Sequence, residues 1–262
     1  MLLTIDIGNS NINFGLYDRD QLLFVSRLLT EIKKTEIEYA VLIHHILHLQ
    51  KLDAKKIHGT IISSVVPPLT PVIREAIRLT VPGMPIMQVG PGIRTGLRIY
   101  TNNPNELGAD FVASSVGVIE KYTLPAAVVD LGTATKISIV DQEHTFVGCS
   151  IMPGVMISLD ALSSRANLLP NISLEPPVPV IGTTTVDCMK SGVILGTASM
   201  LDGMLDRYEE KIGRMETVVA CGGLASAIVP FCRRKICIDD RLILDGLHAI
   251  WKKNTSNSPK GS

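Results

Sequence analysis

The chain has 262 residues, 46% hydrophobic and 19% charged, a balance typical of a globular protein that can bury a core without disulfide or metal staples. Lys and Arg total 25, as do Asp and Glu, which predicts no general attraction to nucleic acid or to acidic membranes. The five irregularly spaced cysteines predict neither a disulfide framework nor a zinc site. No apolar run is long enough to span a bilayer, and the N-terminus lacks a signal-peptide pattern. We therefore expect a cytoplasmic protein.

The first half of the chain alternates apolar β-type runs with amphipathic segments. A capping-box pattern at Thr35 and Glu38 predicts the start of a helix, because the two side chains can each satisfy the other's backbone N–H group. Gly, Pro, Asn and Thr residues over 90–110 predict a long functional loop. The predicted strands are 1–7, 12–17, 22–28, 57–66 and 84–89, and the predicted helices are 37–49, 71–79 and 108–121.

The second half repeats this alternation. Strands are predicted at 126–131, 137–140 and 217–220, and helices at 184–212 and 245–253. The stretch Pro170–Pro179 is predicted to be extended, and the polar residues from Asn254 onward are predicted to fray.

A short internal repeat indicates a duplicated domain. Asp6-Ile7-Gly8-Asn9-Ser10-Asn11 and Asp130-Leu131-Gly132-Thr133-Ala134-Thr135 each follow an apolar strand and precede a second β run. The copies lie close to half the chain length apart, and self-similarity at that period predicts two domains that each open with a β-hairpin. We therefore expect an α/β protein with similar halves at 1–115 and 116–254, a central cleft and a flexible tail at 255–262.

The residues of the repeat suit a polyphosphate. Glycine allows a tight turn and a close approach of the backbone to a ligand, and the following N–H groups and Asn, Ser or Thr side chains can donate to phosphate oxygens. An Asp at the end of a strand can hold a cation or its water. No Walker loop is present, so two facing hairpins would grip the phosphates instead. The alternative is that each Asp-x-Gly is an ordinary turn.

Two other motifs could carry chemistry. Asp110 is predicted in the first turn of a helix, where the helix dipole favours a charged carboxylate that can orient a substrate hydroxyl and take its proton. Gly222-Gly223 follows a late strand, where paired glycines could let an adenine or ribose lie flat on the backbone. The alternatives are simple helix capping by Asp110 and a plain Gly-Gly turn.

With these motifs in order, the sequence resembles the type III pantothenate kinases from Asp6 to about Asn254. The resemblance rests on the two repeat copies and on a set of shorter motifs, namely Gly90-Pro91-Gly92, Thr95-Gly96, Asn103-Pro104, Leu107-Gly108-Ala109-Asp110, Pro153-Gly154, Gly182, Thr185, Ser191-Gly192 and Gly222-Gly223-Leu224-Ala225. It implies the duplicated actin-like fold of the acetate and sugar kinases. It also implies ATP-dependent phosphorylation of pantothenate, the first step of coenzyme A biosynthesis, by a homodimer that binds its substrate near the subunit interface.

The resemblance further implies a role for each matching position. Asp110 would be the catalytic base. Asp6 would lie near Mg²⁺, and Asp130 would hold K⁺ or NH₄⁺, since the sequence shows no obvious cationic neighbour for it. ATP would be lined by Asp6, Gly8, Asn9, Ser10, Asn11, Asn13, Thr133, Gly222 and Gly223. Pantothenate would be surrounded by Tyr100, Gly108, Ala109, Asp110, Phe111 and Thr185.

The sequence departs from the family pattern at several of these motifs. Phe111 stands where the family has an Arg that meets the pantothenate carboxylate, and the loss of one charge-assisted hydrogen bond costs about 1.5–3 kcal/mol. Lys136 follows the second copy of the repeat, where the family usually has Thr. Cys149 and Cys221 replace a Gly and a Thr. Two alternatives therefore stay open: a non-catalytic, nucleotide-binding regulator, or a kinase for another small hydroxylated substrate.

Overall fold

The computed structural model describes residues 1–166 and 168–255, and the side chain of Asn105 is left out of the description. The chain forms two compact units, which differ from the simple halves expected from the repeat. The first unit comprises 1–97, 102–120 and the segment from Leu242 onward, and the second comprises 98–101 and 121–241. The last helix thus belongs to the first unit although it follows the second unit in the sequence.

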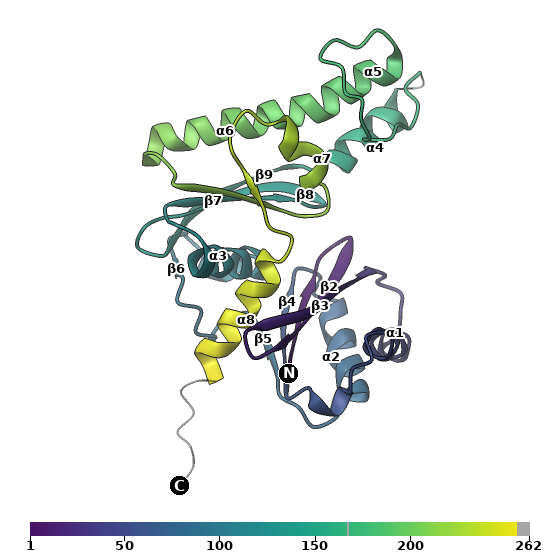
Figure 1. Cartoon of the computed structure of the whole chain (residues 1–262), viewed down its shortest axis with the longest axis vertical. Coiled ribbons are helices and arrows are strands. Elements are labelled where there is room, and N and C mark those ends of the chain that lie inside the picture. The colour runs from purple at the N-terminus through teal and green to yellow at the C-terminus, as the bar shows by residue number, and fades with distance from the viewer. Residues whose placement is uncertain (167, 256–262) are drawn as a thin grey trace. The chain divides into compact units, whose positions relative to one another are not determined.

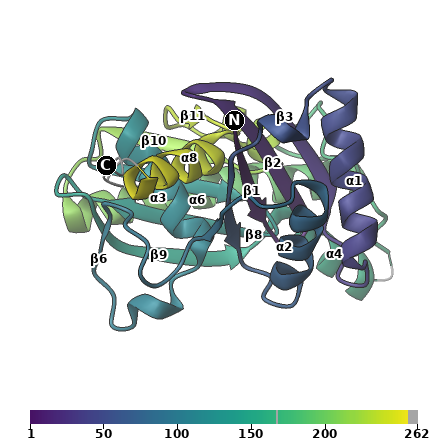
Figure 2. The same ribbon diagram turned by 90° about the horizontal axis from the view of Figure 1, so that it is seen from below.

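The first unit is built on a five-stranded sheet in the order β3-β2-β1-β4-β5 (Figures 1 and 2). β1 pairs antiparallel with β2 and parallel with β4, and its side chains are buried throughout. The strands are β1 (Leu2–Ile7), β2 (Asn11–Asp18), β3 (Gln21–Leu29), β4 (Gly59–Ser64) and β5 (Ile86–Gln88). The helical elements are α1 (Glu36–Leu49), η1 (Ala54–Lys56), α2 (Leu69–Thr80), η2 (Pro104–Glu106), α3 (Ala109–Lys121) and α8 (Leu242–Thr255).

Helices α1 and α2 lie side by side and close the core of the first unit against β1, β2 and β4 (Figure 2). The predicted capping box begins α1, because Glu38 N–H donates to Thr35 Oγ1 and Thr35 N–H donates to the Glu38 carboxylate. Helix α8 packs on β1, β2 and β4. It also lies against α3 so closely that a Cβ atom at Gly246 would be 1.9 Å from the carbonyl oxygen of Ala113.

The second unit repeats this topology. Its six-stranded sheet has the order β11-β10-β7-β8-β9-β6, in which the first five strands reproduce the pairing pattern of the first sheet. The strands are β6 (Arg98–Ile99), β7 (Ala126–Leu131), β8 (Ala134–Val140), β9 (Thr145–Pro153), β10 (Thr217–Cys221) and β11 (Cys237–Ile238). The duplicated fold expected from the sequence is confirmed, and β6 is an addition at the edge.

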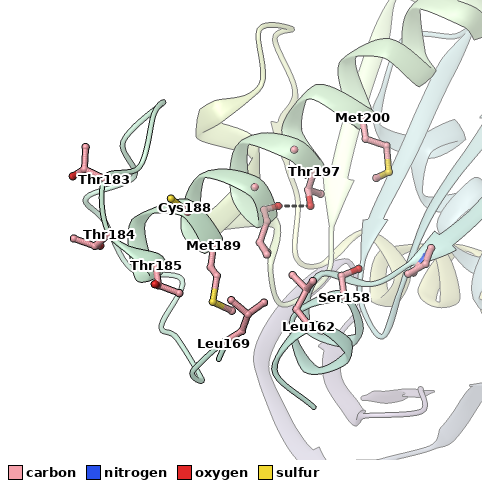
Figure 3. A pocket seen from close by; sticks show the side chains of 14 residues that line it. Ser158, Leu162, Leu169, Thr183, Thr184, Thr185, Cys188, Met189, Thr197 and Met200 are labelled. Carbon is pink, nitrogen blue, oxygen red and sulfur yellow. Dashed lines mark hydrogen bonds between the residues drawn. The ribbon is translucent and has the colours of Figure 1, made fainter. Parts of the chain in front are cut away.

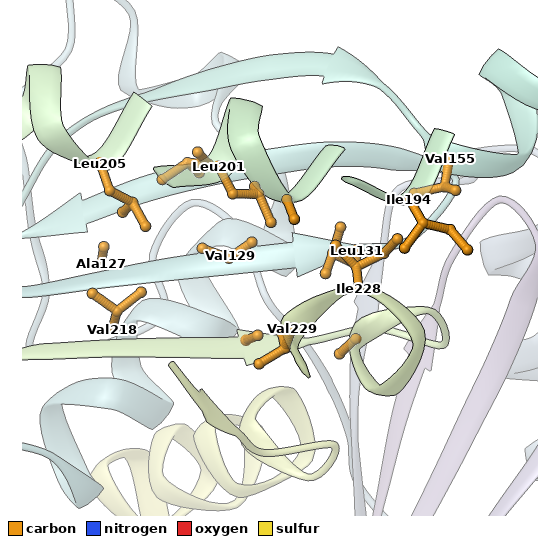
Figure 4. Packing of buried hydrophobic residues seen from close by; sticks show 14 of the residues in the cluster. Ala127, Val129, Leu131, Val155, Ile194, Leu201, Leu205, Val218, Ile228 and Val229 are labelled. Carbon is orange, nitrogen blue, oxygen red and sulfur yellow. The ribbon is translucent and has the colours of Figure 1, made fainter. Parts of the chain in front are cut away.

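One face of the second sheet is covered by the helix predicted over 184–212 (Figure 1). It is continuous from Thr185 to Ile212 but contains one π-helical stretch, since the chain runs through α5 (Thr185–Lys190), η3 (Ser191–Leu195) and α6 (Gly196–Ile212). Leu201 and Leu205 of α6 point onto Ala127 and Val129 of β7 and are fully buried (Figure 4). Both leucines are therefore core residues of the second unit. The other helical elements are α4 (Val155–Arg165), α7 (Ala225–Ile228) and η4 (Val229–Phe231).

An ion pair joins the two ends of the chain segment that forms the second unit. Lys121 Nζ and the Tyr122 hydroxyl donate to Asp239 Oδ2, and the Arg241 N–H donates to Asp239 Oδ1. Asp239 is only 8% exposed. Burial raises the pKa of this carboxyl, but the hydrogen bonds from Lys121 and Tyr122 outweigh burial and the pKa is lowered.

Several local expectations need correction. Strand β9 and helix α4 were not predicted, because Gly148 and the half-exposed residues of β9 blur its period and Pro153-Gly154 masks the start of α4. The predicted loop 90–110 contains β6 and η2. Thr255, assigned to the flexible tail, ends α8, and 256–262 lie outside the described residues. Among the described residues no helix is long and apolar enough to cross a membrane.

Candidate functional site

The turn between β1 and β2 in the first unit is held in one shape by backbone and side-chain hydrogen bonds. Gly8 N–H donates to the Asn11 carbonyl at 2.9 Å. Thr30 braces both sides of the turn, because its hydroxyl donates to the Gly8 carbonyl at 2.6 Å and its N–H donates to the Ser10 carbonyl at 3.0 Å. Asn9 and Ser10 are exposed at its tip. A rigid turn with exposed amide and hydroxyl groups can receive phosphate oxygens.

Asp6 lies at the carboxyl end of β1 and is 6% exposed. Its cross-strand neighbour is Asn13, and its neighbour on the parallel strand β4 is Ser63, whose buried hydroxyl has no hydrogen-bond partner among the described residues. Carboxylate, amide and hydroxyl oxygens are the donors that Mg²⁺ prefers, and this ion usually takes one or two carboxylates together with phosphate oxygens. The donor set around Asp6 therefore fits Mg²⁺, although no cluster of three His, Cys, Asp or Glu side chains occurs in the described chain.

Asp110 lies in the first turn of α3, also in the first unit. Its Oδ1 atom accepts a hydrogen bond of 2.8 Å from the N–H of Phe111, so the carboxylate is fastened at the positive end of the helix dipole. A Cβ atom at Gly108 would lie 2.5 Å from that same Oδ1 atom. The absent side chain of Gly108 thus leaves the space that the Asp110 carboxylate occupies.

Phe111 is 9% exposed and begins the run 111–118 of α3, in which every residue is buried. The position where an Arg was expected to meet a substrate carboxylate therefore holds a buried aromatic ring. Ala109 begins α3 and is half-buried.

The corresponding hairpin of the second unit centres on Asp130, at the end of β7. A Cβ atom at Gly132 would lie 3.2 Å from Asp130 Oδ1, and one at Gly222 would lie 2.8 Å from it. Gly222 has φ +96°, a conformation that favours glycine, and the turn that it begins packs on the end of β7. The structure thus brings together the second repeat copy and the Gly222-Gly223 motif, which the sequence places 90 residues apart from one another.

Asp130 also has a cationic partner that the sequence analysis did not foresee. Lys136 lies directly opposite it in the β7–β8 register, and its Nζ atom is 2.7 Å from Asp130 Oδ2. Both side chains are largely buried, with 16% and 18% of their surface exposed. A monovalent cation bound to this carboxylate would compete with an ammonium group already in contact with it, so the residues present do not fit the expected K⁺ or NH₄⁺ site.

Thr133 and Gly223, expected to touch ATP, are both exposed in the second unit. A Cβ atom at Gly154, the residue that precedes α4, would lie 2.0 Å from the Thr133 carbonyl oxygen, so the start of α4 rests on this turn. Tyr100, expected near the substrate, follows β6 and is 79% exposed.

Thr185 lines a cavity of about 850 Å³ in the second unit, between α4 and the helix that contains the π-helical stretch (Figure 3). Its lining includes the polar residues Ser158 and Thr183–Thr185 and the apolar residues Leu162, Leu169, Met189 and Met200. Thr197 closes one side, with its hydroxyl bonded to the Val193 carbonyl at 2.6 Å. A cavity of this size with few polar groups suits a small organic ligand.

Sequence reasoning missed the pairing of Lys136 with Asp130, and it missed Ser63, Thr30 and the cavity residues of α4. Lys136 alone had a readable signal: once β7 and β8 are paired as a hairpin, a residue six positions after Asp130 falls opposite it. Thr30 and Ser63 lie on other strands, and their proximity to the first hairpin depends on sheet order.

Comparison with known proteins identifies the family. The family model described as type III pantothenate kinase matches residues 2–207. A type III pantothenate kinase of Syntrophus aciditrophicus is 40% identical over 255 residues, which are 97% of this chain and 100% of that protein.

Solved structures show the same fold at low identity. A conserved Campylobacter jejuni protein assigned to the Baf family of transcriptional activators matches with TM-score 0.61 and 20% identity, over 97% of this chain and 99% of that one. A Sinorhizobium meliloti protein described as a 2-dehydro-3-deoxygalactonokinase matches with TM-score 0.56 and 11% identity, over 100% and 98% of the two chains. These likenesses concern the fold, a duplicated kinase fold. The nearly full-length match to curated relatives goes further, and the chain belongs to the type III pantothenate kinase family.

Proposed function

We propose that the protein transfers the γ-phosphoryl group of ATP to the primary hydroxyl of pantothenate, the first step of coenzyme A synthesis. The observation that carries this proposal is the Asp110 carboxylate, fixed at the start of α3 by the Phe111 N–H in a chain that matches the family over nearly its whole length. Asp110 would orient the hydroxyl and accept its proton as the oxygen bonds to phosphorus and ADP leaves. Catalysis of this kind depends mainly on positioning and on neutralisation of charge.

The other residues have supporting roles in this proposal. The turn Gly8–Asn11, with Asn13, would receive the phosphates, and Asp6 would hold Mg²⁺, which neutralises phosphate charge when bound. Thr133, Gly222 and Gly223 of the second unit would line ATP. Tyr100, Gly108, Ala109, Phe111 and Thr185 would line the acceptor, with Thr185 contributing from the rim of the cavity.

We further propose a homodimer in the cytoplasm. Exposed apolar side chains occur on α4 and along the segment that follows it, where Ile157, Leu168, Val180 and Ile181 are 46%, 91%, 78% and 83% exposed. Apolar surface of this kind is typical of protein contacts. The five cysteines are free thiols, as a reducing compartment maintains them. Light scattering at micromolar protein should give twice the chain mass, and a monomeric mass would contradict the dimer.

The test of the main proposal is ADP release with and without pantothenate. We expect pantothenate-dependent turnover in the wild type and its loss in Asp110→Asn, because the amide cannot accept the proton. ATP binding should be retained in that variant. Wild-type protein that binds ATP but releases no ADP with pantothenate would remove the kinase assignment and favour a nucleotide-binding regulator.

The buried ring of Phe111 supports a second candidate, a kinase for a related alcohol without a carboxylate. Pantothenyl alcohol carries the same hydroxyl but no carboxylate, so the ratio of kcat/KM for the two compounds measures recognition of the charge. A charge-assisted hydrogen bond would favour pantothenate by at least about 10-fold. A ratio near unity, or one that favours the alcohol, would support the second candidate.

A further inference from the structure

The two copies of the Asp-x-Gly hairpin differ at one position that faces the aspartate. In the first copy Asp6 lies opposite Asn13, a neutral amide whose Oδ1 accepts a hydrogen bond of 3.2 Å from Arg27 Nε. In the second copy the position opposite Asp130 is occupied by Lys136. The two hairpins share their pairing pattern, so the same place on the sheet carries an amide in one unit and a positive charge in the other.

Lys136 and Asp130 form a largely buried ion pair, unlike the ion pairs between exposed side chains on a protein surface. The Nζ–Oδ2 distance is 2.7 Å, and less than a fifth of either side chain is exposed. The other carboxylate oxygen, Oδ1, faces the backbone at Gly132 and Gly222, where even a Cβ atom would lie within about 3.2 Å. The carboxylate is therefore enclosed by close backbone on one side and approached by an ammonium group on the other.

An ammonium group and a potassium ion have the same charge and similar size, and both seek carboxylate and carbonyl oxygens. Two such cations cannot share one carboxylate at contact distance in a poorly hydrated site without strong repulsion. A tethered ammonium group also has an entropic advantage over a free ion. A free ion loses translational freedom when it binds, whereas the lysine side chain is already held near the carboxylate by the folded chain.

We propose that the Lys136 ammonium group takes the place of a monovalent cation on Asp130, so that this protein needs neither potassium nor ammonium ion. The charge that a bound ion would place at the end of β7, beside Gly132 and Gly222, is instead supplied by the chain itself. This inference rests on the proposed function only for its activity measurement, since the proposed site can also be followed through stability.

The first experiment compares the wild type in KCl, NH₄Cl, NaCl and choline chloride at equal ionic strength. Rates of pantothenate-dependent ADP release and midpoints of thermal unfolding should agree among the four salts within about 2-fold and about 1 °C, because surface screening is the same in each. A wild-type rate that falls at least about 10-fold when sodium replaces potassium would overturn the inference.

The second experiment opens the site. Lys136→Ala should create a selective cation requirement, so that potassium raises the rate about 10-fold over sodium and raises the unfolding midpoint by about 4 °C. Lys235→Ala is the matched control, because Lys235 is an exposed lysine of the same unit and its loss changes net charge equally. The control should behave as the wild type does. A Lys136→Ala variant that folds and shows no preference between potassium and sodium would also overturn the inference.

A double variant separates a specific site from a general salt effect. Asp130→Asn combined with Lys136→Ala leaves no unpaired charge at the end of β7, so it should fold even if Lys136→Ala alone does not. It should lose the selective response to potassium, and a retained response would place the ion elsewhere and refute the assignment. If the wild type shows no kinase activity in any salt, the proposed function fails, while the unfolding midpoints of the variants still decide this inference.

Discussion

Replacement of Gly108 by alanine should displace the Asp110 carboxylate. The new Cβ atom would lie 2.5 Å from Asp110 Oδ1, whereas ordinary van der Waals contact begins at 3.4 Å, so the carboxylate must move by about 0.9 Å. A displacement of about 1 Å in a reacting group can cost about 100-fold in rate. We therefore expect Gly108→Ala to lower kcat for pantothenate-dependent ADP release by about 100-fold.

The same substitution should leave the fold intact. Gly108 does not have a positive φ, and its obstructing neighbour is the end of a short side chain, so the change in free energy of unfolding should stay within about 1 kcal/mol. Gly203→Ala in α6 is the matched control, because no atom beyond the adjoining backbone of its own helix lies within 4 Å of the new Cβ position. A Gly108→Ala enzyme with kcat within about 3-fold of wild type would refute the positioning argument. A fall in kcat that is accompanied by a fall in the free energy of unfolding well beyond about 1 kcal/mol would instead indicate misfolding.

Two stability predictions follow from other contacts. Lys121→Met should lower the free energy of unfolding by about 2 kcal/mol at pH 7, below the 3–5 kcal/mol of a fully buried pair because Lys121 is 27% exposed and Tyr122 still donates to Asp239. Since the pKa of Asp239 is lowered in the folded protein, the stability that it contributes is present above the unfolded pKa of about 3.9 and is lost as pH falls through the folded pKa. Urea unfolding should therefore show a difference in free energy of unfolding between wild type and Lys121→Met that is constant from about pH 5 to 8 and becomes smaller below about pH 4. A difference that does not change in acid would contradict the ion pair. Thr35→Ala should cost about 1 kcal/mol through loss of the α1 cap, and urea unfolding with no measurable change would show that the cap contributes nothing.

The sequence alone determined the duplicated fold, for reasons that are local. The strand-Asp-x-Gly pattern at Asp6 and Asp130 depends on residues that adjoin in the chain, and both copies form the predicted hairpins. The capping box at Thr35 and the first-turn position of Asp110 are likewise set within one helical turn. Such features depend on backbone geometry over a few residues, and that geometry can be read directly from residue type.

Tertiary structure decided the features that depend on contacts between distant segments. The packing of α8 in the first unit depends on the close fit of Gly246 against Ala113, which no local sequence pattern predicts. The burial of Phe111 depends on what packs over α3, and the meeting of Gly222 with Asp130 depends on β10 pairing beside β7. The pair of Asp130 and Lys136 depends on both local and tertiary structure. The register of the hairpin places the two residues opposite each other, but the ion pair is buried only because the end of β7 is enclosed by the fold. A side chain's neighbours along the strand are set by the sequence, whereas the neighbours that surround it and exclude water are set by the fold.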